Sequence, residues 1–393
     1  MYNSKWRYIK LDFGKNKTAK ILLFSFLVVV LIFTVIFTSC KTGKTSEEEP
    51  IAEEPEESSE EVEDDSGKKI DEEKIAGIEI IGDINILSGL DISGEAGDSR
   101  PIAVMVENTP DARPQSGLIY ADIVFEVVDE YGVTRYVVVY SSYVAEIVGP
   151  VRSARLYYAE IARSFDPIYA FWGTYTEAYK VIEDLGLDVL TPLGDQSGNS
   201  TIVANTSSGW RDTSRSNITE HTAFMSTIKL KEDAEELGYP LEGGQSPLRF
   251  KIDAVDSERG NINNIAINFS DQNAYKTNFE YNKEENTYYK YLAGSPHTDY
   301  ETGKQIKVNN VIVMITDIEG PIDEAQHMAV RTTGTSDIGK AFFFMDGNVI
   351  EGTWERTSAF DPFKYKDDDG NIVLFNRGST WVALIQDTNR LTY

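Results

Sequence analysis

Arg152 and Arg155 lie three residues apart in the segment GPVRSAR, directly before a stretch with helical periodicity. If that helix begins near Ser153, both guanidinium groups lie on one side of its first turn, beside backbone N–H groups that have no partner within the helix. Such an arrangement suits a carboxylate or a phosphate. The alternative is that both arginines pair with carboxylates of the preceding hairpin and fix the helix. Arg113, in a proline-bounded loop, is a further candidate for ligand binding or for clamping its loop.

Two carboxylates form a second candidate group. Asp122 and Glu126 are four residues apart in a predicted strand and therefore lie on the same face. If the following turn centres on residues 130 and 131, Glu126 lies opposite Arg135, and a cross-strand ion pair is expected. The two carboxylates could also be the acid and the nucleophile of a glycosidase.

The sequence offers few signals for metal or nucleophilic chemistry. His221, His297 and His327 are far apart, Cys40 is the only cysteine, and no HExxH motif occurs. GxSxG, P-loop and dinucleotide-binding motifs are absent as well, so no metal and no cofactor is expected. His221 follows Glu220 in a polar segment and is the conceivable catalytic base.

The elements that position these residues mix strands and helices. Ile102 to Glu107 reads as a buried strand, and Asp122 to Val128 with Val133 to Ser141 reads as a hairpin. Helices are expected from about 154 to 165 and from about 176 to 185, where Gly186 favours a left-handed cap. Further elements of this half are a strand at Ile168 to Trp172, a polar loop at Gly194 to Asn217, and a short helix at Lys229 to Leu237.

The second half of the chain reads almost entirely as strands. Asp346-Gly347 and Asp369-Gly370 are hairpin turn signals. The expected fold class is therefore α+β, with a mixed domain at 77–245 and a mostly antiparallel β-domain at 246–393. The candidate strands are Ile265 to Phe269, Asn278 to Tyr281, Tyr288 to Leu292, Val308 to Ile315, Met328 to Thr333, Lys340 to Met345, Asn348 to Trp354, Ile372 to Phe375 and Thr380 to Leu384.

Residues 1–39 have the organisation of an export signal. A basic segment precedes an apolar run from Ile21 to Phe37. The next residues, FTSC, resemble the lipobox of bacterial lipoproteins, although Phe37 stands where leucine is usual. This resemblance implies cleavage before Cys40 and a lipid such as palmitate on its sulfur. The alternative is a retained transmembrane anchor, and under either interpretation the remainder lies outside the cytoplasm.

Residues 40–76 are expected to form a disordered acidic tether. The stretch from Thr45 to Ile75 contains fifteen acids and three lysines, and so contributes −12 to the formal net charge of −27. It is poor in aromatics and self-repelling, and it cannot bury enough apolar surface to fold. This charge balance gives no support to nucleic-acid binding.

Several strings, taken in order, are similar to one known family. RPIAVMVENTPDARPQSGL, ADIVFEVV, TRY and GPVRSAR resemble the N-terminal domain of the YerB-like lipoproteins, and NNVIVM, DGNVIEGTW and DGNIVLFNRGSTWV resemble its C-terminal domain. The resemblance covers nearly all of residues 98 to 385. It implies a protein on the outside of a bacterial membrane, and no particular activity.

These patterns favour a non-catalytic binding protein of the cell envelope. Its ligand-binding residues are expected to be Arg113, Arg135, Arg152 and Arg155, and its ligand an anionic or glycan-bearing molecule or a protein partner. The alternative function is a cell-wall hydrolase that uses Asp122 or Glu126. A scaffold for other envelope proteins is a third possibility.

Overall fold

The computed structural model describes residues 78–92 and 97–393. The predicted export signal, the predicted lipidation site at Cys40 and the predicted acidic tether lie outside these residues. Within the described part of the chain, no helix is both long enough and apolar enough to cross a membrane.

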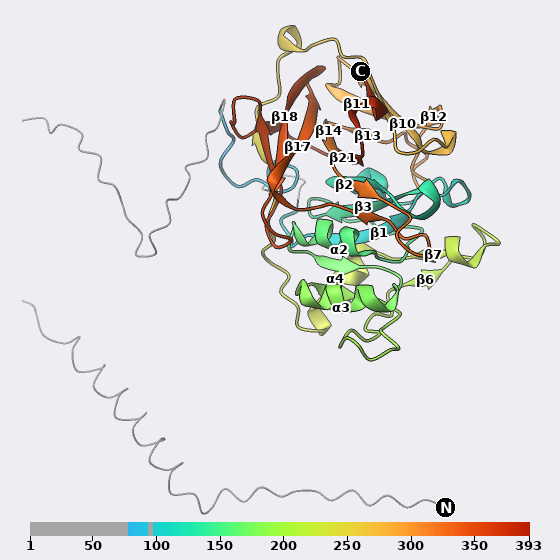
Figure 1. Cartoon of the computed structure of the whole chain (residues 1–393). Coiled ribbons are helices and arrows are strands. Elements are labelled where there is room, and N and C mark those ends of the chain that lie inside the picture. Colours follow the sequence, from blue (N-terminus) through green and yellow to red (C-terminus); the bar gives the residue numbers. More distant parts are fainter. Residues whose placement is uncertain (1–77, 93–96) are drawn as a thin grey trace, which may run out of the picture. The chain divides into compact units, whose positions relative to one another are not determined.

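A ten-stranded mixed sheet forms the centre of the described part (Figure 1). Residues 102–140 supply three neighbouring antiparallel strands, because their continuous runs of Val, Ile, Tyr and Phe suit a sheet that is covered on both faces. The order across the sheet is β19 (Lys364–Asp367), β18 (Asn348–Arg356), β17 (Gly334–Met345), β14 (Asn310–Ile315), β21 (Thr380–Ile385), β2 (Ile123–Val128), β3 (Thr134–Tyr140), β1 (Ile102–Glu107), β4 (Ile168–Ala170) and β5 (Asp188–Leu190).

The two halves of the sequence meet inside this sheet. β2 pairs in parallel with β21, with Ile123 opposite Thr380 and Glu126 opposite Ala383. β14 also pairs in parallel with β21, whereas β17, β18 and β19 continue the sheet in antiparallel fashion. Strands from 77–245 and from 246–393 therefore share one hydrogen-bonded sheet. The proposed boundary near residue 245 stays a prediction.

A second sheet is built from the C-terminal half alone. Its order is β12 (Ser295–Pro296), β11 (Thr287–Leu292), β10 (Lys276–Asn282), β9 (Asn264–Asn268) and β22 (Leu391–Thr392), with β13 (Lys307–Val308) paired to β11. All of these pairings are antiparallel. Residues 78–92 and 97–393 also form three small two-stranded sheets: β15 (Ile318–Glu319) with β16 (Ala329–Val330), β8 (Arg249–Lys251) with β20 (Leu374–Asn376), and β6 (Trp210–Arg211) with β7 (Ala223–Phe224).

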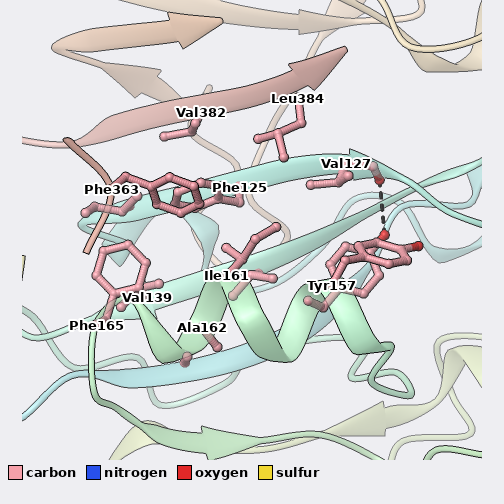
Figure 2. Close-up of a cluster of buried hydrophobic side chains, with 14 of the residues drawn as sticks. Phe125, Val127, Val139, Tyr157, Ile161, Ala162, Phe165, Phe363, Val382 and Leu384 are labelled. Atoms are coloured by element: carbon pink, nitrogen blue, oxygen red, sulfur yellow. Dashed lines mark hydrogen bonds between the residues drawn. The ribbon is translucent and has the colours of Figure 1, made fainter. Parts of the chain in front are cut away.

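The described residues form three α-helices, α2 (Leu156–Arg163), α3 (Thr176–Asp184) and α4 (Thr227–Glu236), and all of them lie before residue 245. Helix α2 points Ile161 and Ala162 into an apolar cluster with Phe125 and Val139 of the main sheet (Figure 2). Phe125 lies at 5.8 Å from Phe363 and at 5.9 Å from Phe165, measured between ring centroids. One face of the main sheet is thereby covered by segments of both halves.

The opposite face of the main sheet packs against the second sheet. Trp381 of β21 contacts Tyr136 of β3 and Phe279 of β10, with ring centroids 5.3 and 6.0 Å away. Val124 and Tyr288 belong to the same buried cluster. Because side chains alternate along a strand, Phe125 faces α2 while Val124 faces the second sheet.

The observed elements confirm the predicted α+β class. The strands expected at 102–107, 122–128 and 133–141 correspond to β1, β2 and β3. The three helices expected at about 154–165, about 176–185 and 229–237 correspond to α2, α3 and α4. Gly186 follows α3 with φ of +64°, the predicted left-handed conformation.

Candidate functional site

Three of the four predicted ligand-binding arginines converge on one cavity. Its volume is 320 Å³, and Arg135, Arg152 and Arg155 all line it. We call it the arginine pocket. Its other lining residues are Glu107, Thr109, Glu130, Tyr131, Val133, Thr134, Ala325 and His327.

The segment before α2 places two of these arginines. The backbone N–H of Arg152 donates to Met105 O of β1 at 3.0 Å, and its carbonyl accepts from Trp172 N at 3.0 Å. The helix begins only at Leu156, with Arg155 as its N-cap residue. The prediction that it starts near Ser153 was therefore wrong, because residues 152–154 are held extended between β1 and residues 172–173.

Arg135 and Arg155 are paired with carboxylates of the β2–β3 turn. Arg135 Nη2 lies 2.5 Å from Asp129 Oδ2, and Arg155 Nε contacts Glu130 Oε1. Burial raises the pKa of Asp129, but the charges of Arg135 and Arg155 outweigh burial and hold that pKa below its usual value. Burial, together with the neighbouring Asp129, raises the pKa of Glu130. The alternative reading, in which hairpin carboxylates pair with the arginines, thus holds for Arg155.

Arg152 is the least satisfied of the three guanidinium groups. Its nearest carboxylate oxygens belong to Glu107 and Glu220, at 3.5 and 3.9 Å. Its Nη1 donates to Glu220 O at 3.4 Å, its buried Nε makes no hydrogen bond, and no hydrogen bond of its Nη2 is seen with the described residues. Its side chain is 24% exposed. Burial lowers its pKa, so the charge of Arg152 is only partly compensated by its surroundings. This guanidinium has donor capacity left for a ligand.

Glu107 and His221 extend the site. His221 Nδ1 lies 2.8 Å from Glu107 Oε2, and Thr109 Oγ1 donates to Glu107 Oε1 at 2.8 Å. Both members of the pair are buried. The structure therefore brings His221 beside Arg152, through Glu107. Glu107 was not predicted as a site residue, although a carboxylate that ends an otherwise apolar buried strand was a visible signal.

His327 lines the arginine pocket, although the sequence did not predict it as a site residue. His327 Nδ1 lies 2.6 Å from Asp323 Oδ2, and its ring stacks on Tyr175 with centroids 4.3 Å apart. Arg155 lies over the same Tyr175 ring, 5.9 Å from its centroid. The loop that carries His327 is more than 150 residues from α2 in sequence, and no local pattern could have placed it here.

Comparison with known proteins agrees with this architecture. Residues 87–240 match the N-terminal domain, and residues 265–382 the C-terminal domain, of the family described as "Protein of unknown function (DUF3048)". The chain belongs to the DUF3048 family. It is 33% identical over 310 residues to "Putative lipoprotein YerB" of Bacillus subtilis (strain 168), covering 77% of this chain and 86% of that protein. The family resemblance read from the sequence is thus confirmed.

A solved DUF3048 relative supports the fold. The crystal structure of YerB protein from Bacillus subtilis superposes with a TM-score of 0.67 at 29% identity, and the match covers 79% of this chain and 98% of that one.

Arg113 lies outside the arginine pocket of this DUF3048 chain. Its Nε donates to Asn108 Oδ1 at 3.0 Å, its Nη2 donates to Asn108 O at 2.6 Å, and its guanidinium lies over the Tyr275 ring. These contacts clamp the loop after β1 against the second sheet. They correspond to the structural use that was the alternative interpretation of Arg113.

Glu126 does not pair with Arg135, and that prediction was wrong. In the observed register Glu126 lies opposite Tyr136, and Arg135 lies opposite Val127. The β2–β3 turn centres on Tyr131, which has φ of +60°. The predicted centre lay between residues 130 and 131, half a residue earlier in the chain. Because side chains alternate, this one-residue shift puts Glu126 and Arg135 on opposite faces of the sheet.

The two hydrolase candidates occupy different environments. Glu126 is completely buried and accepts hydrogen bonds from Trp381 Nε1 at 3.1 Å and Thr134 Oγ1 at 3.0 Å. Asp122 is also buried, and its Oδ2 accepts from the backbone N–H groups of Ser141 and Ser142 at 2.6 and 2.9 Å. Burial raises the pKa of Asp122 to about 6, against the lowering effect of those hydrogen bonds.

The described residues also contain no group of three or more His, Cys, Asp or Glu side chains that could hold a metal ion.

Proposed function

We propose that this chain is a lipoprotein, held by a lipid on Cys40 at the outer face of a bacterial cell membrane. The basic segment, the apolar run and the FTSC string support this address. So does the name of the Bacillus subtilis relative, "Putative lipoprotein YerB". In this proposal the acidic segment 40–76 spaces the folded part from the bilayer, since a self-repelling chain is extended.

The proposed activity is binding of a cell-envelope glycan that carries a carboxylate, in the arginine pocket. The observation that carries this proposal is the incomplete pairing of Arg152, which is partly exposed, lines the cavity and makes one long hydrogen bond, from Nη1 to Glu220 O at 3.4 Å. A guanidinium matches a carboxylate in geometry and charge, and such charge-assisted bonds are stronger than neutral ones.

The remaining walls favour a sugar over a densely charged ligand. The arginines face Glu107, Asp129 and Glu130, so the charges at the site are nearly balanced. Such a site offers both donors and acceptors for hydroxyl groups. Tyr131, which lines the pocket and is 71% exposed, provides an aromatic face on which a sugar ring can pack.

The experiment measures binding of soluble cell-wall fragments to the full chain in detergent. Each fragment preparation is used twice, once untreated and once with its carboxyl groups amidated. We expect Arg152→Ala to weaken binding of the untreated fragments by about tenfold or more, as for loss of a charged hydrogen bond. Arg331→Ala, an arginine that pairs with Asp317 and does not line this pocket, is the matched control. Thermal denaturation verifies that both variants are folded.

The outcomes separate the alternatives. Equal binding of untreated and amidated fragments, or equal loss in the two variants, would contradict the proposal. Mass spectrometry of the same mixtures reports any cleavage products, which would instead favour the hydrolase if Glu126→Gln or Asp122→Asn abolished them. Retention of a protein in place of a glycan would favour the partner-binding alternative. Absence of a lipid on Cys40 of the membrane-bound chain, measured by mass spectrometry, would contradict the lipid anchor.

A further inference from the structure

A larger hollow of 730 Å³ shares no lining residue with the arginine pocket. We call it the lysine groove. Segments that are distant in sequence line it. They lie within residues 88–90, 119–122, 287–289 of β11, 304–309 around β13, and 377–379 before β21, with Tyr143 and Asp253 in addition.

Cations outnumber acids on the walls of the lysine groove. Lys304, Lys307 and Arg377 face Asp122 and Asp253. This is unusual in a chain whose formal net charge is −27. The Asp122 carboxylate is buried, and its Oδ2 accepts two backbone hydrogen bonds.

The three cations differ in how firmly they are paired. Lys307 Nζ lies 2.7 Å from Glu285 Oε2, and Tyr289 Oη donates to the same carboxylate. Arg377 Nε is 4.0 Å from Asp253 Oδ1, and its side chain is 43% exposed. Lys304 is exposed, and no contact of its ammonium group is seen with the described residues. Arg377 and Lys304 therefore have donors available to a bound anion.

The walls also offer hydroxyl groups. Thr287 lines the groove, and its buried hydroxyl lies beside the Glu285 carboxylate. Tyr143, 40% exposed, adds an aromatic ring with a polar tip.

We infer that the lysine groove binds a phosphate-bearing chain molecule, with phosphates held by Arg377 and Lys304 and with hydroxylated units between them. Phosphate fits better than carboxylate because its oxygens point in several directions and can accept from donors on separate segments of the wall. This site is independent of the glycan proposed for the arginine pocket.

The test is calorimetric titration of the full chain in detergent with inorganic tripolyphosphate at physiological salt. Arg377→Ala and Lys304→Ala are each expected to raise Kd at least fivefold, and the double variant at least twentyfold. All substituted side chains are on the surface, so the variants should fold, and thermal denaturation verifies it.

Lys340→Ala is the matched control for nonspecific attraction. Lys340 is a surface lysine, 48% exposed, as the substituted Lys304 is a surface lysine, but it lies outside the groove. Unchanged binding in Lys340→Ala supports the assignment. The inference is overturned by absence of binding to the unmodified chain, by equal weakening in Lys340→Ala, or by citrate binding as tightly as tripolyphosphate.

Discussion

Lys290 Nζ lies 3.7 Å from Glu126 Oε2, and both side chains are completely buried. The pair joins β11 of the second sheet to β2 of the main sheet, and thus the two halves of the sequence. The ammonium group also lies 4.5 Å from the centroid of the Trp381 ring, whose N–H donates to Glu126. Burial lowers the pKa of Lys290 to about 8, against the opposing charge of Glu126.

Removing one member of this pair should destabilise the fold strongly. Lys290→Met leaves the Glu126 carboxylate without a cation, and Glu126→Gln leaves the ammonium without an anion. We expect each to lower the free energy of unfolding by about 3–5 kcal/mol. The double variant should cost much less than the sum of the two, since neither charge then remains. Urea denaturation measures all three, and strict additivity would show that the pair is not coupled.

Asp122 should make stability depend on pH in the acidic range. Its pKa is raised from 3.8 to about 6, so the folded state holds the proton more tightly than the unfolded state does. The stabilisation by that proton is complete below about pH 4 and is lost as pH rises to about 6. Relative to Asp122→Asn, the free energy of unfolding of the unmodified chain should fall by about 3 kcal/mol across this window. Parallel pH profiles would contradict the assignment.

Arg135 should be the most stabilising arginine of the pocket. It faces Asp129, which is completely buried, and its Nη1 donates to Ser153 O at 2.6 Å. Arg135→Met should therefore cost about 3–5 kcal/mol, because a buried carboxylate loses its main partner. Lys180→Met is the control: its partners Glu183 and Asp184 are surface groups, and no measurable change in Tm is expected. Similar losses in the two variants would contradict this ranking.

Local sequence patterns predicted the elements better than their pairing. Ile102–Glu107 was placed correctly because an unbroken apolar run with β-branched residues has a strong strand preference. The predicted β2–β3 register was wrong by one residue because Tyr131 adopts a left-handed conformation, which is uncommon for a residue other than glycine. The pairing of β2 with β21 joins residues about 250 positions apart, and nothing local specifies it.

The sequence predicted two arginines of the candidate site but not the residues that surround them. Arg152 and Arg155 were identified because two arginines at close spacing precede a helix. Glu107, His221 and His327 meet them only through tertiary packing. The convergence of these groups therefore had to come from the structure.

Gly186 and Gly117 both have a left-handed backbone, but only at Gly117 would an added Cβ clash with a neighbouring atom. Comparing the two alanine variants therefore separates the free-energy cost of the backbone conformation from that of a steric clash. Gly186 has φ of +64° and open space where a Cβ would lie, so Gly186→Ala should cost only about 1 kcal/mol, the price of the backbone conformation alone. Gly117 has φ of +88°, but a Cβ there would lie 2.6 Å from the carbonyl oxygen of Ile147. Since backbone cannot yield as a flexible side chain can, Gly117→Ala should cost clearly more, about 3 kcal/mol or above. Equal destabilisation of the two variants in urea would mean that the loop around Gly117 is free to move away from Ile147.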